Sequence, residues 1–297
     1  MNLLSLWQRA TRRSPATSRN AASSPDEQLL FSLYLLAWAV EARDPYTGGH
    51  LWRVARLSRL LAEAAGLDAA TVARIAIGAF LHDLGKIGIP DAVLGKKGRL
   101  DEAEYAVIKT HPEIGQRMLA GHPLAALAED AILLHHETPD GRGYPYGRRG
   151  HEIPLVARIV GICDAFDAMT SSRPYRNGMP IARAMEIIEE ELGRQFDAEL
   201  GRRFIGLADN PALAHIVGHS DQGIPLQCCT MCGPIVVRPR QARDGDALYC
   251  PACHSEYTIT GDTLLATGRQ NAARALAATP DTDLIGRLVG ESVAVLA

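Results

Sequence analysis

Apolar residues recur three or four positions apart through most of residues 25–210, which is the spacing of amphipathic helices. The first helix is predicted to begin at Ser24, because Ser24 and Glu27 form a capping box around Pro25, which suits a first helical turn. The same pattern predicts later helices over residues 51–65, 69–85, 101–109, 124–136, 154–170, 180–192 and 197–207, and one that starts at Pro112. No convincing strand pattern interrupts them, so we expect an all-α domain over residues 25–210.

Length and composition set the outer limits of the interpretation. A chain of 297 residues allows about two domains, and 47% hydrophobic with 22% charged residues is ordinary for a globular protein. The net charge of −3 argues against a surface tuned as a whole to nucleic acid, although local basic pockets stay open. The longest apolar run, residues 29–40, is shorter than the roughly 20 residues needed to cross a bilayer.

Residues 1–24 carry four arginines and no acidic side chain. They lack the apolar stretch of a secretory signal, so we expect a disordered basic lead, with a helix on a membrane surface as a weaker alternative. With no export signal, a cytoplasmic location is expected. There the six cysteines stay reduced, and metal binding is favoured over disulfides.

Several histidines and aspartates lie within or beside apolar helical segments, where a buried ionisable side chain needs a partner. His82 and Asp83 end an apolar helical run, and Asp164 lies inside an otherwise apolar helix. Each residue alone is explained as well by an ordinary surface or core role. Together they favour metal binding, because a buried ionisable group is costly unless it is paired or coordinated. Imidazole and carboxylate are the ligand set of Fe, Mn, Zn or Co.

Adjacent ligands such as His82 and Asp83 project about 100° apart and can reach two neighbouring metal positions. An aspartate between two metals can bridge them, and paired metals can activate a hydroxide and hold a phosphate. Lys86 lies one helical turn after His82 and could neutralise a phosphate oxygen. A solvated lysine at a helix end is the competing interpretation.

Three separated motifs resemble a known family. The segment HDLGKIG at residues 82–88 is similar to the signature of the HD metal-dependent phosphohydrolases. The segments HHE at 135–137 and DGRGYP at 140–145 resemble the HD-GYP subfamily, and residues 164–176 extend the match. The resemblance covers about residues 40–205. It implies an all-α HD-type domain and hydrolysis of cyclic di-GMP to linear pGpG or GMP by a metal-activated hydroxide.

The resemblance also implies roles for single residues. It implies a binuclear metal centre held by His50, His82, Asp83, His111, His135, His136 and Asp164, with Asp83 bridging. It places Lys86 and Asp83 at the catalytic centre and assigns substrate binding to Gly143, Tyr144, Asp167, Arg173 and Arg176. Asp167 is expected to orient Lys86. Tyr46 stands where some members carry a glutamate that binds a third metal, so two metals are expected, with Fe and Mn equally suited.

The second half of the sequence changes character after residue 218. Two Cys-x-x-Cys pairs, Cys229 with Cys232 and Cys250 with Cys253, are separated by 17 residues, which is typical of a four-cysteine zinc site. A redox pair is the competing interpretation, and Cys228 leaves the first pair ambiguous by one position. Strand-like segments at 235–237, 248–249 and 257–259 predict a small β zinc-ribbon-like module over residues 223–262. Residues 268–297 are expected to form a short helix and a tail.

The module's partner and the chain's oligomeric state stay open at this point. Arg238, Arg240 and Arg243 lie between the cysteine pairs, so nucleic acid is not excluded, but the lack of interleaved aromatics favours a structural or protein-contact role. The leading hypothesis for the whole chain is a cyclic di-GMP phosphodiesterase. The alternatives are an HD phosphohydrolase acting on another cyclic nucleotide and a non-catalytic receptor for cyclic di-GMP.

Overall fold

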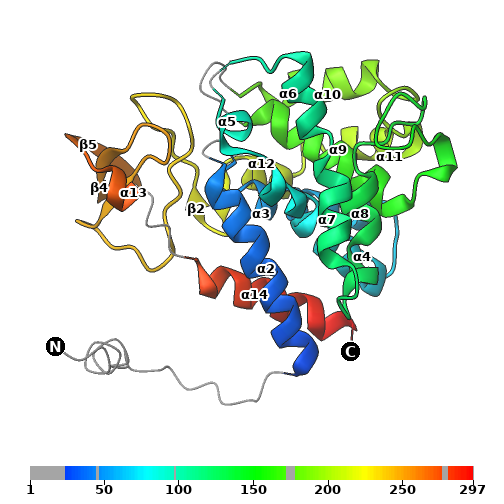
Figure 1. Cartoon of the computed structure of the whole chain (residues 1–297), viewed down its shortest axis with the longest axis horizontal. Helices are drawn as coiled ribbons and strands as arrows, with labels where there is room; N and C mark the ends of the chain where they lie inside the picture. The colour runs from blue at the N-terminus through cyan, green and yellow to red at the C-terminus, as the bar shows by residue number, and fades with distance from the viewer. Residues whose placement is uncertain (1–23, 45–46, 97, 172–177, 276–279, 297) are drawn as a thin grey trace.

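A computed structural model describes residues 24–44, 47–96, 98–171, 178–275 and 280–296 of the chain. Helices form most of this structure, and a small β module lies to one side (Figure 1). The α-helices are α2 (Pro25–Arg43), α3 (His50–Ala64), α4 (Ala69–Leu81), α5 (Asp91–Leu94), α6 (Glu102–Ile108), α7 (His111–Leu119), α8 (Glu129–Leu134), α9 (Leu155–Thr170), α10 (Ile181–Glu190), α11 (Ala198–Ile205), α12 (Pro211–Val217), α13 (Ala272–Ala275) and α14 (Thr282–Leu296). The expected all-α domain is therefore confirmed in its helical character.

Local capping sets where several helices begin. The predicted capping box at the start of α2 is confirmed: the Glu27 N–H donates to Ser24 Oγ, and the Ser24 N–H donates to the Glu27 carboxylate. Asp68 caps α4 by accepting the Thr71 N–H at 3.0 Å. Such caps satisfy amide groups that have no partner inside the helix.

Helices α3, α4 and α9 form the centre of the core. Their largest buried side chains include Trp52, Leu57, Phe80 and Phe166, each no more than 2% exposed. Because α3, the end of α4 and α9 also carry the candidate metal ligands, this packing holds the ligands on rigid elements rather than on free loops.

Two predicted helices end differently in the structure. The helix expected over 69–85 ends at Leu81 and continues as a 3₁₀ turn, η1 (Leu84–Gly88). The backbone at Gly85 approaches the His111 carbonyl too closely for a side chain, so this turn depends on glycine. The single helix expected over 124–136 is divided into η2 (Ala125–Leu127) and α8, because Ala128 leaves the helical conformation with φ −134°.

The β module contains two small antiparallel sheets. Strands β1 (His219–Asp221) and β2 (Ile224–Pro225) pair first, and β3 (Ala247–Tyr249), β4 (Ser255–Thr260) and β5 (Thr263–Gln270) form the second sheet in chain order. The strand expected at 235–237 is wrong in extent, since only Ile235 bridges to Cys228. Strand β5 continues the sheet past residue 262, so the module is longer than the sequence indicates.

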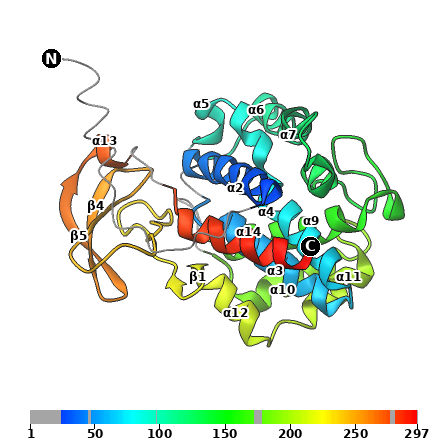
Figure 2. The same cartoon turned by 90° about the horizontal axis from the view of Figure 1, so that it is seen from below.

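The C-terminal segment contains the expected short helix, α13, but most of the segment after it forms a second helix. After the brief α13, helix α14 returns to the helical domain and packs against α2 and α4 (Figure 2). Ile285 is fully buried there, and the Glu291 carboxylate accepts two bonds from Arg56, at 2.6 and 3.0 Å. The spacing of apolar residues in α14 is typical of a helix. The helices that it packs against lie near the other end of the chain, so the local sequence does not predict them.

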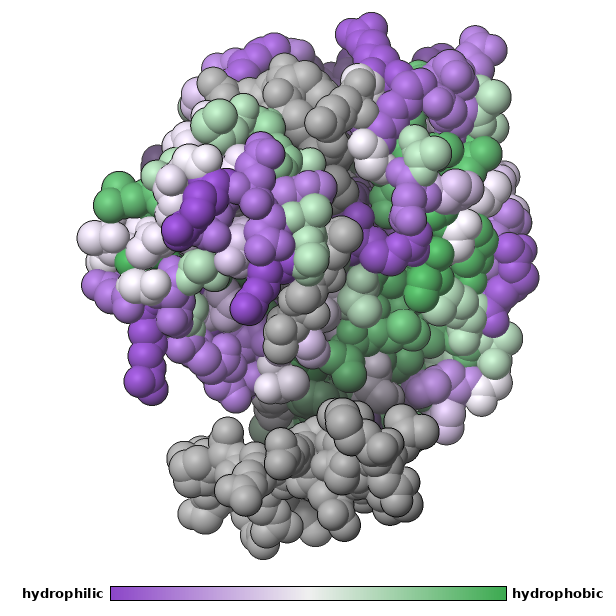
Figure 3. Space-filling view, turned by 60° about the vertical axis from the view of Figure 1, so that its left-hand side comes forward, coloured by the Kyte–Doolittle hydropathy of each residue, from purple (hydrophilic) through white to green (hydrophobic). Residues whose placement is uncertain are grey.

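Figure 3 shows that hydrophilic side chains predominate on the side of the β module, whereas hydrophobic residues gather over the neighbouring helices. Among the partly buried residues packed on the core are Phe31, Leu35 and Trp38 of α2. Within the described ranges, none of the helices combines the length and apolar character that a membrane-spanning segment requires.

Candidate metal centre

Seven histidine and aspartate side chains from separate elements meet in the core of the helical domain. They come from the start of α3, the end of α4, the start of α7, the end of α8 and the middle of α9, and are His50, His82, Asp83, His111, His135, His136 and Asp164. Their ligand atoms fall into overlapping groups in which all atoms lie within 4.8 Å of one another. The structure therefore brings together every residue that the resemblance assigns to the metal centre.

One group consists of His50, His82 and Asp164. The His50 Nε2 atom lies 3.4 Å from His82 Nε2 and 3.4 Å from Asp164 Oδ1. Three donor atoms this close, from imidazoles and a carboxylate, form one half of a site suited to a divalent transition metal.

The other group consists of His111, His135 and His136, with 3.4 Å between His111 Nε2 and His135 Nε2. Asp83 lies between the two groups. Its Oδ1 is 3.4 Å from His111 Nε2, and its Oδ2 is 3.4 Å from His82 Nε2. One carboxylate thus faces both groups with different oxygens, which is the arrangement that a bridging ligand requires.

The tautomers of the imidazoles fit cation binding. The Nδ1 atoms of His82, His111 and His135 lie 2.7–2.8 Å from the carbonyl oxygens of Ala79, Ile108 and Ala131. Because each Nδ1–H donates to a backbone carbonyl, each Nε2 carries no hydrogen and directs its lone pair into the cluster. Facing lone pairs 3.4 Å apart have no hydrogen to share, so the residues present fit a pair of metal ions.

Burial favours neutral imidazoles at His111, His135 and His136. It lowers the pKa of His111 to about 4 and that of His136 to about 3. For His135, burial and the neighbouring His136 also lower the pKa well below its usual range. A neutral imidazole is the form that coordinates a metal, so these side chains need no deprotonation at neutral pH.

His50 is held by a buried ion pair. Its Nδ1 lies 2.7 Å from Asp167 Oδ2, and Arg53 donates to both Asp167 oxygens at 2.5 and 3.0 Å. Asp167 is only 1% exposed. The expectation that Asp167 orients Lys86 is therefore not met, since its carboxylate is occupied by His50 and Arg53. The sequence offers one missed signal, which is Arg53 placed three residues after His50.

Lys86 instead pairs with the central carboxylate. Its Nζ lies 2.7 Å from Asp83 Oδ2. Burial alone would raise the pKa of Asp83, but the neighbouring Lys86 ammonium holds it well below its usual range. Asp83 is therefore ionised at neutral pH, and Lys86 supplies a positive charge beside the cluster.

The glycine-rich loop covers one side of the centre. The Tyr144 ring stacks on His136 with 4.6 Å between ring centroids. A Cβ at Gly143 would lie 2.5 Å from the His136 carbonyl oxygen, so this position requires glycine. Buried Glu137 accepts the N–H groups of Tyr146 and Arg148 and fixes the loop, a role that the sequence did not indicate.

Three other sequence assignments cannot be placed. Arg173 and Arg176, expected to bind substrate, lie outside the described residues, as does Tyr46, which occupies the expected third-metal position.

A family model for the HD domain matches residues 34–200 of the chain, which is more than half of it. The chain belongs to the HD domain family. This confirms the resemblance drawn from the motifs.

Curated relatives of the HD domain have names that specify cyclic dinucleotide chemistry. The chain is 41% identical over 184 residues to a cyclic di-GMP phosphodiesterase of Thermotoga maritima, covering 61% of this chain and 50% of that protein. It is 44% identical over 168 residues to the cyclic di-GMP phosphodiesterase response regulator RpfG of Xanthomonas campestris, with coverages of 56% and 44%.

A third relative has a different named specificity. The chain is 42% identical over 161 residues to the 3'3'-cGAMP-specific phosphodiesterase 3 of Vibrio cholerae, covering 54% of this chain and 35% of that protein. The chain thus matches half or less of the length of each of these three relatives.

Beside the HD domain, the β module gathers the four expected cysteines. The Sγ atoms of Cys229, Cys232, Cys250 and Cys253 lie within 4.8 Å of one another. Cys228 is exposed and stands outside this group, which resolves the ambiguity in the first pair. Hydrogen bonding to Ser255 lowers the pKa of Cys253 to about 6 against the opposing effect of burial. Four thiol groups at this spacing could hold one tetrahedral metal ion.

The β module also touches the loop that leads into α3. A Cβ at Gly48 would lie 2.7 Å from Val237 Cγ2, and one at Gly49 would lie 2.8 Å from Ser220 Cβ. Since His50 follows directly, the module packs against the backbone that places one candidate ligand.

Proposed function

We propose that the chain is a metal-dependent phosphodiesterase that hydrolyses cyclic di-GMP to linear pGpG, GMP or both. The observation that carries this proposal is the position of Asp83 between two histidine groups, with one carboxylate oxygen toward each. This pattern suits a pair of cations that hold one phosphate. The names of the Thermotoga and Xanthomonas relatives support cyclic di-GMP as the substrate.

His50, His82 and Asp164 would hold one ion, His111, His135 and His136 the other, and Asp83 both. Divalent iron or manganese bound there would supply positive charge to the phosphate and acidify a water molecule. Softness of the ligands suits both metals equally.

The residues of the chain have separate tasks in this proposal. Lys86 donates to Asp83 and is placed to neutralise a phosphate oxygen beside the cluster. Tyr144 and Gly143 lie close against His136 and are proposed to contact the substrate there. The Asp167 and Arg53 pair orients His50 without contacting substrate.

The cysteine group is proposed to bind one structural zinc ion. Support comes from the matched Cys-x-x-Cys pairs and from the short distances among the four Sγ atoms. A structural zinc adds folding energy to a module whose core consists of few residues, with Val236 and Tyr257 among them. The module is then a candidate contact surface for another protein.

A second candidate substrate is the hybrid dinucleotide 3'3'-cGAMP, which the name of the Vibrio relative favours. The reaction is the same phosphodiester hydrolysis, so the two candidates differ only in base recognition. A receptor that binds cyclic di-GMP without cleaving it is the non-catalytic alternative.

The test is turnover by the purified full chain loaded anaerobically with Fe²⁺ or Mn²⁺. Cyclic di-GMP and 3'3'-cGAMP are supplied separately, and linear products are followed by chromatography. We expect linear pGpG or GMP as the product from cyclic di-GMP. We also expect a higher kcat/KM for cyclic di-GMP than for 3'3'-cGAMP. A higher kcat/KM for 3'3'-cGAMP would make the hybrid dinucleotide the preferred substrate. Tight binding of cyclic di-GMP without any product would favour the receptor.

A further inference from the structure

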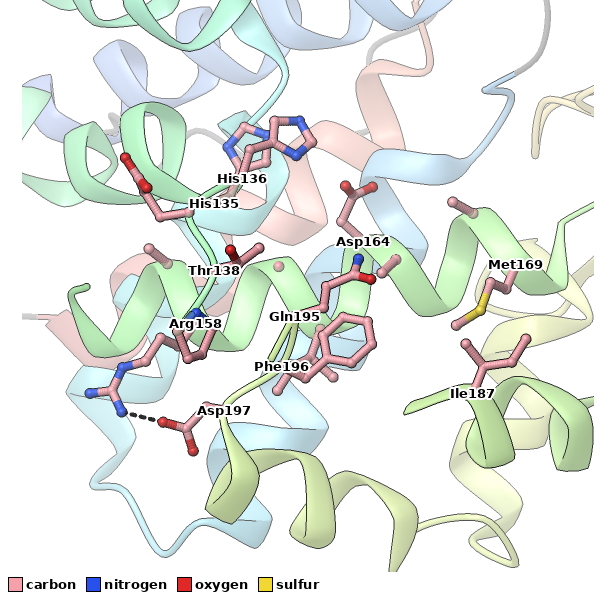
Figure 4. Close-up of a pocket in the computed structure, with 17 residues that line it drawn as sticks. His135, His136, Thr138, Arg158, Asp164, Met169, Ile187, Gln195, Phe196 and Asp197 are labelled. Atoms are coloured by element: carbon pink, nitrogen blue, oxygen red, sulfur yellow. Dashed lines mark hydrogen bonds and ion pairs between the residues drawn. The ribbon is translucent and has the colours of Figure 1, made fainter. Parts of the chain in front are cut away.

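We propose that a cavity bounded by α9, α10 and the segments 135–139 and 195–197 is a binding subsite for one purine base of a nucleotide substrate, an inference that rests on the proposed function. The cavity has a volume of about 410 Å³, within the range of roughly 300–1,000 Å³ common for small-molecule sites. It lies beside the candidate metal centre (Figure 4).

The floor of the cavity is a helix face without large side chains. Ala165 and Ala168 of α9 line it three residues apart, on one face of the helix. Farther along α9, Ala157 is buried and the His135 carbonyl lies against Gly161. Such a face is flat, and a planar ring can lie against it with little loss of contact.

The walls are apolar. Phe196 is 3% exposed, and Met169 and Ile187 line the side formed by α9 and α10. An aromatic ring and a methionine sulfur are favourable neighbours for a planar heteroaromatic group.

One end of the cavity meets the candidate ligands. His136 and Asp164 are among its lining residues, and Figure 4 shows both side chains above α9. A nucleotide whose phosphate lies at the metal centre can therefore direct its base into the cavity.

The polar groups divide into fixed and available ones. Arg158 and Asp197 form an ion pair at 2.7 Å, and Asp197 also accepts the N–H groups of Glu199 and Leu200. These contacts occupy the far end. Gln195 lines the cavity and is exposed, and in Figure 4 its amide points toward Asp164. An amide offers both a donor and an acceptor, which matches the edge of a purine.

The test compares two substrates of the metal-loaded full chain: cyclic di-GMP and methyl 4-nitrophenyl phosphate, which has no base. The variant Ala168→Leu places a side chain in the cavity, and Ala182→Leu makes the same change at an exposed position of α10. We expect Ala168→Leu to lower the ratio of the two kcat/KM values about tenfold or more, with the bound metal unchanged. Ala182→Leu should leave the ratio unchanged.

A second variant avoids any folding problem, because Gln195 is exposed. Gln195→Ala removes the amide and should raise KM for cyclic di-GMP about threefold to tenfold while kcat stays within about twofold. If both substrates respond equally to Ala168→Leu and Gln195→Ala leaves KM unchanged, the subsite is wrong while the proposed function stands. If the unsubstituted chain cleaves only the small diester, both proposals are wrong.

Discussion

Asp167 joins a candidate ligand to the protein core through a buried carboxylate. It contacts His50 Nδ1, the Arg53 guanidinium and the Ser171 hydroxyl, and its side chain is almost fully enclosed. The Arg53 guanidinium is equally buried, at 1% exposure. Neither charge has access to bulk water, so each depends on the other.

Replacing Asp167 with alanine is therefore expected to be costly. The Asp167→Ala variant leaves Arg53 buried without its carboxylate, and the free energy of unfolding should fall by about 3–5 kcal/mol. Urea denaturation measures this value. Asp91→Ala is the control, since Asp91 pairs with Arg43 at the surface and is 83% exposed, so its loss should cost less than about 1 kcal/mol. Equal losses in the two variants would contradict the account.

Residue types were predictable here, but their internal contacts were not. Histidine and aspartate in the HD and HHE motifs indicated a metal site from chemistry and resemblance alone. The pairing of Asp167 with Arg53 joins residues 114 positions apart, so it depends on how α3 meets α9. The spacing of Arg53 from His50 is visible in the sequence, but that Asp167 is their shared partner is not.

At the scale of elements, helix α11 is tied to α9 through one aspartate. Asp197 caps α11 by accepting two N–H groups and also pairs with Arg158 of α9. Although partial burial acts in the opposite direction, these donors lower the pKa of Asp197 below its usual value. The capping contacts and the ion pair thus favour the charged carboxylate.

The sign of the pH dependence follows from that shift. Because the folded-state pKa of Asp197 is depressed, its stabilisation is present above the unfolded-state pKa and is lost as pH falls through the folded value. Asp197→Asn keeps a good cap but removes the charge, so it should be about 1 kcal/mol less stable than the parent near pH 7. The difference should shrink as pH falls below the ordinary pKa of an aspartate, about 3.9.

Thermal unfolding at several pH values measures this difference. Asp209→Asn serves as the control, because Asp209 is exposed between α11 and α12 and its replacement should give no pH-dependent difference. If the stability difference between the parent and Asp197→Asn stayed constant down to pH 3, the ionised carboxylate would be excluded as its cause.

Element boundaries were predictable where a cap or a glycine marked them. The start of α2 at Pro25 followed from its capping box, and α3 ends just before Gly66 as predicted. The break at Ala128 carries no such signal, since alanine favours helix and only the tertiary packing of α8 moves it out of that conformation. The short strand expected near Ile235 failed because its neighbours offer it only one bridge.

For the whole molecule, the chain leaves the helical domain after α12, forms the β module and returns as α14. Asp221 of β1 joins these parts, accepting bonds from Arg240 of the module at 3.0 Å and Arg287 of α14 at 2.5 Å. The module is thus fixed at both ends. Division of the chain into separate domains remains a prediction, and the return of α14 could not be inferred because its partners are more than 200 residues away.

Helix α14 should contribute to the stability of the helical domain. Ile285 of α14 is fully buried in the core of the helical domain. Ile285→Ala should therefore lower the free energy of unfolding by about 2–4 kcal/mol, because apolar burial is lost and a cavity is left. Leu265→Ala is the matched control in β5, where the side chain is 55% exposed, and should cost less than about 0.5 kcal/mol. Urea unfolding followed by helical circular dichroism measures both. An Ile285→Ala variant as stable as its control would show that α14 is dispensable.

The central claim is that the histidine and aspartate cluster holds two metal ions bridged by Asp83, apart from the ion at the cysteines. Metal analysis of the purified full chain, its Asp83→Ala variant and its Cys250→Ser variant tests this directly. About three ions per chain are expected, of which Asp83→Ala should lose two and Cys250→Ser only one, the zinc. A chain that binds no metal beyond the ion lost in Cys250→Ser would contradict it.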